Sequence, residues 1–195
     1  MKYLIASDLH GSARYCRALL EMLRREQADR LVLLGDLLYH GPRNPLPEEY
    51  DTQSVAAMLG GVAERVLCVR GNCDSEVDQM ILPFPMLADY ALLSLEGVEL
   101  FATHGHLYGP DAPPPIRSGS FLLCGHTHLP VRRAIEGFTY LNPGSLALPK
   151  EGTPHSCLVL ENGIFTWRDV VSGAAFEPLS LGACVDDNET QSVTD

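Results

Sequence analysis

The sequence predicts an α/β fold in which a pair of mixed β-sheets is covered by helices within one domain. The first half of the chain alternates short apolar runs with amphipathic segments, and the second half contains short strand-like runs separated by turn signals. No linker divides the 195 residues, which suffice for one sizeable hydrophobic core and are marginal for two.

The first half of the chain is typical of a parallel sheet with crossover helices. Its apolar runs are short enough for buried strands, and two of them end at Gly35 and Gly71. Segments with helical spacing of apolar residues lie between these runs, and Ser12 is a plausible N-cap for the first. This alternation implies right-handed crossovers and therefore parallel pairing. The expected elements are strands at 3–6, 31–34 and 65–69 and helices at about 12–27 and 52–59.

The second half of the chain is typical of shorter strands joined by hairpins. Glu96-Gly97 separates two apolar runs, and residues 161–163 mark a further turn. The expected strands are 90–95, 98–103, 121–124, 139–141, 156–160 and 163–167. Residues 183–195 are acidic and polar without an aliphatic period, so we expect a single domain over residues 1–182 and a flexible C-terminal tail.

Composition and charge restrict the classes of partner. The net charge of −11 argues against a protein that coats nucleic acid or anionic membrane, because both need a basic face. The N-terminal apolar run ends after about four residues, and no run approaches the roughly 18 apolar residues of a membrane span. Six scattered cysteines are read as reduced, mostly buried thiols. We therefore expect a cytoplasmic protein that does not contact a membrane.

Side chains that can bind metals follow five of the expected strands. Ligands collect at the carboxyl ends of strands in open α/β sheets, so these loops should converge on one crevice. Carboxylate, amide oxygen and imidazole together suit Mn, Fe or Zn, whereas an all-oxygen site for Mg or Ca would not use four imidazoles. The seven candidate ligands are Asp8, His10, Asp36, Asn72, His104, His126 and His128.

Each of these motifs has a simpler interpretation when it is taken alone. Gly35-Asp36 and Gly71-Asn72 are also typical of tight turns, and His126 and His128 could be surface histidines of a loop. The joint pattern favours a metal site, because every candidate follows a strand and nearly all lie beside glycine.

The motifs resemble those of the calcineurin-like metallophosphoesterases in their order and residues, and more narrowly those of the YfcE-type bacterial phosphodiesterases. The resemblance covers roughly residues 1–170 and implies a β-sandwich of two mixed sheets flanked by helices. The stretches that carry it are Asp8-Leu9-His10, Gly35-Asp36, His40-Gly41-Pro42-Arg43-Asn44, Gly71-Asn72-Cys73-Asp74, His104-Gly105-His106, Gly125-His126-Thr127-His128 and Asn142-Pro143-Gly144-Ser145.

The resemblance implies a phosphodiesterase that hydrolyses a small phosphodiester by in-line attack of a hydroxide bridging two metal ions. Two divalent ions, most commonly Mn²⁺ with Zn²⁺, Fe²⁺ or Ni²⁺ as alternatives, would be held by seven side chains. By this resemblance Asp36 bridges the ions. The other ligands are divided between a first ion held by Asp8, His10 and His128 and a second held by Asn72, His104 and His126.

One position departs from the wider family pattern. Most members carry histidine directly after the metal-binding asparagine, where it is thought to assist the leaving group, whereas this chain and the YfcE-type group carry cysteine. The pKa of a thiol, ordinarily about 8.5, falls beside cations, so we expect Cys73 to be partly thiolate and a poor acid. The expected catalytic residues are Asp36, Asn72, Cys73 and His106, and the expected substrate-binding residues are His40 and Arg43.

Several alternatives stay open. His106, His40 and Arg43 could equally be loop side chains without a functional role. A phosphomonoesterase could use the same site. A non-catalytic, protein-binding scaffold, as in a eukaryotic retromer subunit that resembles this fold, is opposed by the intact ligand set. A nuclease is opposed by the acidic charge and the lack of a basic aromatic groove. Related small phosphodiesterases often associate through exposed strands, so a homo-oligomer is an alternative to a monomer.

Overall fold

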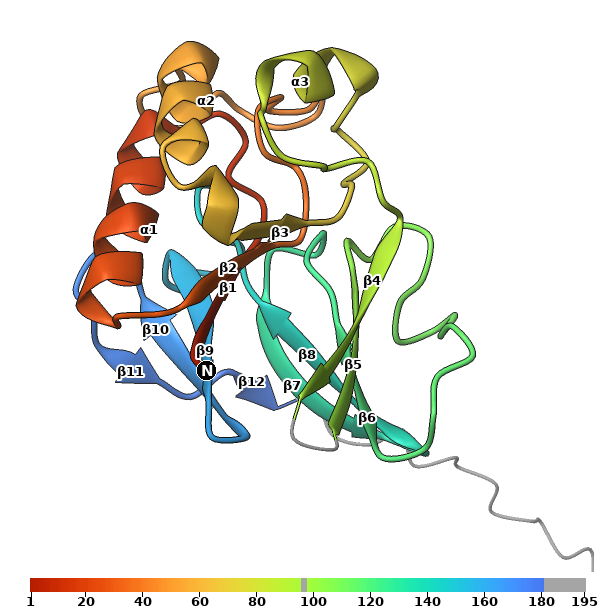
Figure 1. Cartoon of the computed structure of the whole chain (residues 1–195). Coiled ribbons are helices and arrows are strands. Elements are labelled where there is room, and N and C mark those ends of the chain that lie inside the picture. Colours follow the sequence, from red (N-terminus) through yellow and green to blue (C-terminus); the bar gives the residue numbers. More distant parts are fainter. Residues whose placement is uncertain (96–97, 181–195) are drawn as a thin grey trace, which may run out of the picture.

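Two mixed β-sheets face each other in the computed structural model, which describes residues 1–95 and 98–180 (Figure 1). The strands of the first sheet are β1 (Tyr3–Ala6), β2 (Arg30–Leu33), β3 (Val66–Cys68), β9 (Ser156–Glu161), β10 (Ile164–Asp169) and β11 (Ala175–Phe176). The strands of the second sheet are β4 (Tyr90–Leu95), β5 (Val98–Thr103), β6 (Ser120–Leu123), β7 (Pro130–Ile135), β8 (Phe138–Pro143) and β12 (Leu179–Ser180).

The strand order is β11-β10-β9-β1-β2-β3 in the first sheet and β12-β7-β8-β6-β5-β4 in the second. Helices α1 (Ala13–Arg25) and α2 (Thr52–Gly60) cover the outer face of the first sheet, and α3 (Glu76–Ile81) lies above its end (Figure 1). A 3₁₀ turn spans Ala63–Arg65. The prediction of two mixed sheets flanked by helices is confirmed, as is the parallel pairing of β1 with β2 and of β2 with β3.

The central strands are apolar throughout because both of their faces are buried. In β1, Leu4 packs against the helices, whereas Ile5 packs into the core between the two sheets. In β2, Leu31 likewise packs against the helices, and Val32 packs into the core between the two sheets. A strand covered on both sides reads as a continuous apolar run, which is why these strands were recognisable from the sequence.

The predicted N-terminus of α1 is confirmed in detail. The Ser12 side chain accepts a hydrogen bond from the Tyr15 backbone N–H (3.3 Å) and donates one to the carbonyl of Glu48 (2.6 Å). Ser12 therefore caps the helix and also ties the loop that follows β2 to the start of α1. The buried face of the helix consists of Ala13, Tyr15, Cys16, Leu19, Met22 and Leu23.

Some elements were not predicted. β7 begins at a proline and carries Arg132, which is exposed, so its apolar alternation is weak. α3 has six residues, too few for a clear helical period, although Asp78 does act at its start by accepting the Ser75 backbone N–H (2.8 Å). The predicted turn at Glu96-Gly97 and the predicted tail at 183–195 lie outside the described residues.

Two further observations concern the described residues. None of their helices combines the length and the apolar character needed to cross a membrane. The described cysteines are all free thiols, and each of them except Cys73 is buried.

We expect Leu33→Ala to lower the free energy of unfolding by about 2–5 kcal/mol, because it empties a fully buried position on β2 of the first sheet. The matched control is Leu92→Ala on β4, where the side chain is 57% exposed and the change should stay within about 0.5 kcal/mol. Urea unfolding measures both, and equal losses would contradict the assigned core.

Candidate metal centre

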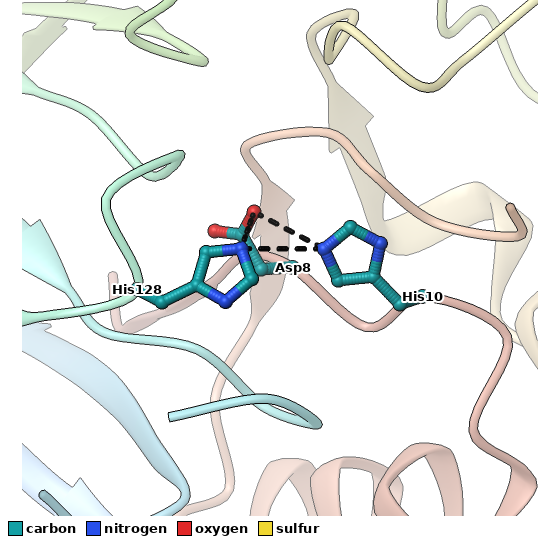
Figure 2. Close-up of side chains that lie close together, drawn as sticks. All are labelled: Asp8, His10 and His128. Carbon is teal, nitrogen blue, oxygen red and sulfur yellow. Dashed lines mark hydrogen bonds and ion pairs between the residues drawn. The ribbon is translucent and has the colours of Figure 1, made fainter. Parts of the chain in front are cut away.

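The loops that follow β1, β2, β3, β5 and β6 meet at one end of the sandwich, and the structure brings the seven candidate ligands together there. Three of them form a tight group, with the Nε2 atoms of His10 and His128 only 3.3 Å apart. Asp8 Oδ1 lies 3.2 Å from His128 Nε2 and 3.7 Å from His10 Nε2. Figure 2 shows that the three side chains point toward a common centre.

Asp36 lies between this first group and a second one. Its Oδ2 atom is 3.7 Å from His10 Nε2 and 3.5 Å from His104 Nε2. On the far side, His104 Nε2 is 3.0 Å from Asn72 Oδ1, and the ring of His126 lies 5.1 Å from the ring of His104. A carboxylate in this position can be shared by two neighbouring cations.

The orientation of three imidazoles is fixed by backbone carbonyls. The Nδ1 atoms of His10, His104 and His128 donate to the carbonyls of Tyr39 (2.9 Å), Leu34 (2.7 Å) and Leu148 (2.6 Å) respectively. Such a bond leaves Nε2 as the ligand atom of a neutral ring. Two lone pairs then face each other between His10 and His128, and this is favourable only where the two atoms share a proton or a cation.

The two buried carboxylates each combine a fixed oxygen with a free one. Asp8 Oδ2 accepts the His126 backbone N–H (3.0 Å), whereas Asp8 Oδ1 is buried with no hydrogen-bond donor among the described residues. Asp36 Oδ1 accepts the Cys73 backbone N–H (2.9 Å), and its Oδ2 faces the imidazoles. A buried carboxylate oxygen without a donor is costly unless a cation satisfies it, so the donor set fits a metal.

Asp74 holds the loop that carries Asp36. Its carboxylate accepts the backbone N–H groups of Asp36 (2.8 Å), Leu37 (2.9 Å) and Gly71 (2.7 Å). The loops after β2 and β3 are therefore joined by one buried side chain, which sets the distance between Asp36 and Asn72.

Backbone strain is concentrated at the candidate ligands. Residues other than glycine rarely adopt positive φ, and such conformations are typical of functional sites. Nine described residues do so here, and five of them are candidate ligands, namely Asp8 (57°), His10 (48°), Asp36 (56°), His126 (68°) and His128 (64°).

The end of β8 and the loop that follows it support the centre. The Asn142 amide donates to the Gly125 carbonyl (2.7 Å) and to Thr127 Oγ1 (3.0 Å), so it holds the loop that carries His126 and His128. The Ser145 hydroxyl donates to the Asp8 carbonyl (2.9 Å). Both residues belong to one of the stretches that carry the family resemblance, and both support the centre through their side chains.

The pKa values of the ionisable groups in the centre depart from their usual values, because the groups are buried next to one another. Burial alone would raise the pKa of Asp8, but contacts with His10 and His128 hold it well below its usual value. Burial would lower the pKa of His104, yet its hydrogen bond to Asp36 and the nearby charge of Asp8 raise it to about 9. In the absence of metal the His104 imidazole therefore takes up a proton in place of a cation.

The remaining predicted residues divide into two sets. A pocket of about 300 Å³ opens over Asp36, Asn72, His126 and His128, and its walls include residues 41–44, Cys73 and Lys150. Arg43 thus lies where a substrate would bind, and Lys150 was not predicted.

His40 and His106 do not line this pocket. The ring of His40 packs edge-on against Tyr39 and Tyr50, and His106 lies beside His104, with ring centroids 5.4 Å apart. Burial and the neighbouring histidines lower the pKa of His106, so its ring is neutral near pH 7.

The expectation of a partly thiolate Cys73 depends on nearby cations, and without metal the thiol is protonated near pH 7. Burial raises the pKa of the thiol to about 12, and the nearby Asp36 carboxylate adds to the shift. The carboxylates of Asp74 and Asp8 also raise the pKa of the thiol, and metal ions bound at the site would act in the opposite direction.

Comparison with known proteins places these residues in a wider group. Residues 1–163 match the model of the calcineurin-like phosphoesterase superfamily domain. A protein named Phosphodiesterase YfcE, from Escherichia coli (strain K12), is 48% identical over 166 residues that cover 85% of this chain and 90% of that protein.

Solved structures agree with this match. A structure of YfcE, described as a phosphoesterase from E. coli, has a TM-score of 0.88 and 44% identity and covers 92% of this chain and 98% of its own. Wild-type Vps29 from Entamoeba histolytica, solved with Zn²⁺, has a TM-score of 0.57 and 19% identity over 90% of this chain and 96% of its own, which shows a shared fold. The resemblance inferred from the motifs is confirmed.

We expect Gly71→Ala to weaken metal binding at least about tenfold. A β-carbon at Gly71 would lie 2.0 Å from Asp36 Oδ1 and 2.4 Å from the Asp36 backbone nitrogen, so the carboxylate would have to move. In Gly60→Ala, the control, the added atom lies 3.5 Å from Pro83 and affinity should not change. Titration calorimetry with Mn²⁺ measures the affinity, and thermal unfolding confirms that each variant is folded. Equal affinities would contradict the assigned contact.

We expect metal binding to release protons at neutral pH, because a ligand imidazole must be deprotonated and the pKa of His104 is about 9 without metal. Affinity should therefore rise with pH and level off above about pH 9, by at most about tenfold per pH unit for each proton released. Calorimetry in two buffers with different ionisation enthalpies counts the protons. Binding at pH 7 without proton release would refute this prediction.

Proposed function

This chain belongs to the calcineurin-like phosphoesterase superfamily, and we propose that it is a metal-dependent phosphodiesterase that acts on a small phosphodiester. The observation that carries the proposal is the close approach of His10 Nε2 and His128 Nε2 (3.3 Å) beside a buried carboxylate oxygen without a donor. The name of the E. coli relative supports a diester substrate over a monoester.

The donor set fits two divalent ions. Asp8, His10 and His128 would hold one ion, Asn72, His104 and His126 would hold the other, and Asp36 would bridge them. When bound, such ions neutralise charge on the phosphate and lower the pKa of water, which supplies a hydroxide for in-line attack on phosphorus. Imidazoles with carboxylates suit Mn²⁺, with Zn²⁺, Fe²⁺ and Ni²⁺ as alternatives.

The protein's own residues bind and orient the substrate. Arg43 lines the pocket, where its guanidinium would pair with an anionic group of the substrate. Cys73 is a poor proton donor near pH 7 whether its thiol keeps the raised pKa it has without metal or loses its proton beside the ions, and His106, with a lowered pKa, is a poor donor as well. The leaving group would therefore depart without a dedicated acid, so esters of acidic alcohols such as phenols should react fastest.

Two other functions are less well supported. A non-catalytic scaffold of the same fold is one alternative, but the complete set of seven candidate ligands, five of them buried, favours an enzyme. A phosphomonoesterase would use the same residues, and the identity to a phosphodiesterase opposes it. The acidic net charge and the free thiols support a cytoplasmic enzyme without membrane or nucleic-acid partners. A homo-oligomer stays a prediction.

We expect exhaustive chelation to abolish hydrolysis of bis(4-nitrophenyl) phosphate and Mn²⁺ to restore it. The diester should be hydrolysed with a higher kcat/KM than 4-nitrophenyl phosphate.

Asp36→Asn should lower kcat/KM for the diester more than about 100-fold, because it removes the shared carboxylate. The control is Asp111→Asn, at an exposed position, which should not change it. Hydrolysis that survives chelation would contradict the metal mechanism. A higher kcat/KM for the monoester than for the diester would favour the phosphomonoesterase.

A further inference from the structure

The pocket over the metal centre carries two cationic side chains on its walls. Arg43 belongs to the loop after β2, and Lys150 belongs to the loop between β8 and β9. Because β9 and β2 lie on either side of β1 in the first sheet, the two loops flank the β1 loop that carries Asp8. The cations therefore enter the pocket from two separate segments.

The segments that carry the two cationic residues contact the loops of the metal centre. Gly41 packs closely in the Arg43 loop, since a β-carbon there would lie 3.2 Å from Cys73 Sγ and 3.2 Å from the Asn44 amide nitrogen. On the other side, the Lys150 backbone N–H donates to the His128 carbonyl (3.3 Å), and its own carbonyl accepts from the Thr153 hydroxyl (2.7 Å). The positions from which the two side chains extend are therefore set by the site.

Neither cation has an anionic partner within the part of the chain that the structure describes. Most other basic side chains there bind carboxylates or carbonyls, as Lys2 does with Glu26 and Arg70 does with Asp89. The pocket walls contain no carboxylate besides Asp36, which faces the imidazoles. In a chain with a net charge of −11, two free cations beside one pocket point to an anionic ligand.

A simple phosphodiester does not supply enough negative charge for this pocket. Its single charge, the attacking hydroxide and the carboxylates of Asp8 and Asp36 would together balance the four positive charges of two divalent ions. Arg43 and Lys150 would then stay unmatched. The pocket volume of about 300 Å³ is also at the lower end for small-molecule sites, which excludes a long polymer from its interior.

We infer that the substrate is a small phosphodiester with a second anionic group, a carboxylate or a phosphate, on one of its two ester arms, and that Lys150 and Arg43 bind that group. This inference rests on the proposed function. It assigns Lys150 as a specificity residue, a role that nothing in its sequence context indicates.

The test compares esters that share the 4-nitrophenolate leaving group and differ in the other arm. The arms are propyl, 2-carboxyethyl and 2-phosphoethyl, assayed with the Mn²⁺-loaded full chain. We expect kcat/KM to be about tenfold higher with an anionic arm, mainly through KM, because each arm gains a charge-assisted hydrogen bond. The better of the two anionic arms identifies the group. Added salt should reduce the preference.

Variants assign the preference to residues. Lys150→Met and Arg43→Met should each bring the ratio of anionic to propyl arm toward one, and Lys150→Arg should retain it. The matched control is Arg117→Met, an exposed arginine in the loop before β6, at the opposite end of that strand from His126, which should keep the wild-type ratio. A ratio near one in the wild type, or a ratio unchanged in both methionine variants, overturns the inference.

A binding measurement separates this inference from the proposed function. Calorimetric titration of 3-phosphonopropionate and of propylphosphonate into the Mn²⁺-loaded protein reports the same ratio without catalysis. Failure to hydrolyse any of the three esters would contradict the proposed function. Tighter binding of 3-phosphonopropionate that depends on Lys150 would still support the anion site, and equal binding of the two compounds would overturn it.

Discussion

The burial of two carboxylates is the constraint on which the rest of the site depends. Asp8 is 0% exposed and Asp36 is 2% exposed, and an unpaired buried charge costs several kcal/mol. Each carboxylate is satisfied partly by a backbone N–H, from His126 and from Cys73, and these bonds draw the loops after β6 and β3 toward the loops after β1 and β2. The free oxygens then face imidazoles, so the same requirement that shapes the loops also collects the ligands.

The packing of the sandwich beneath the loops offsets the conformational cost of this arrangement. Each ligand held at positive φ costs of the order of 1–3 kcal/mol, and such conformations persist only where the surroundings determine them. Here the surroundings are the buried apolar clusters on the two faces of the first sheet, the Asp74 carboxylate between two loops and the Ser145 hydroxyl on the Asp8 carbonyl. Rigidity in the ligands contrasts with the exposed Arg43 and Lys150 on the pocket walls, which remain free to follow an anionic ligand.

The features that the sequence predicts are those set by neighbouring residues in the chain, and the features that depend on contacts between distant residues are not predicted. β1 and β2 were predicted because strands buried on both faces are apolar throughout, and the candidate ligands because each follows a strand. Asn142 and Ser145 act through contacts with residues far away in the chain, so their neighbours in sequence do not predict that they support the centre. Lys150 reaches the pocket because β9 lies beside β1, which its neighbours in sequence do not reveal. The pKa of Cys73 depends on Asp36, a neighbour only in space.

The central claim is a centre of two metal ions with Asp36 shared between them. Anomalous diffraction at the manganese absorption edge, from crystals of the Mn²⁺-loaded protein, tests it most directly, because it counts the ions and locates them. We predict two peaks about 3.5–4 Å apart, the first beside Asp8, His10 and His128, the second beside Asn72, His104 and His126, with Asp36 touching both. A single peak, or peaks away from these side chains, would contradict the account.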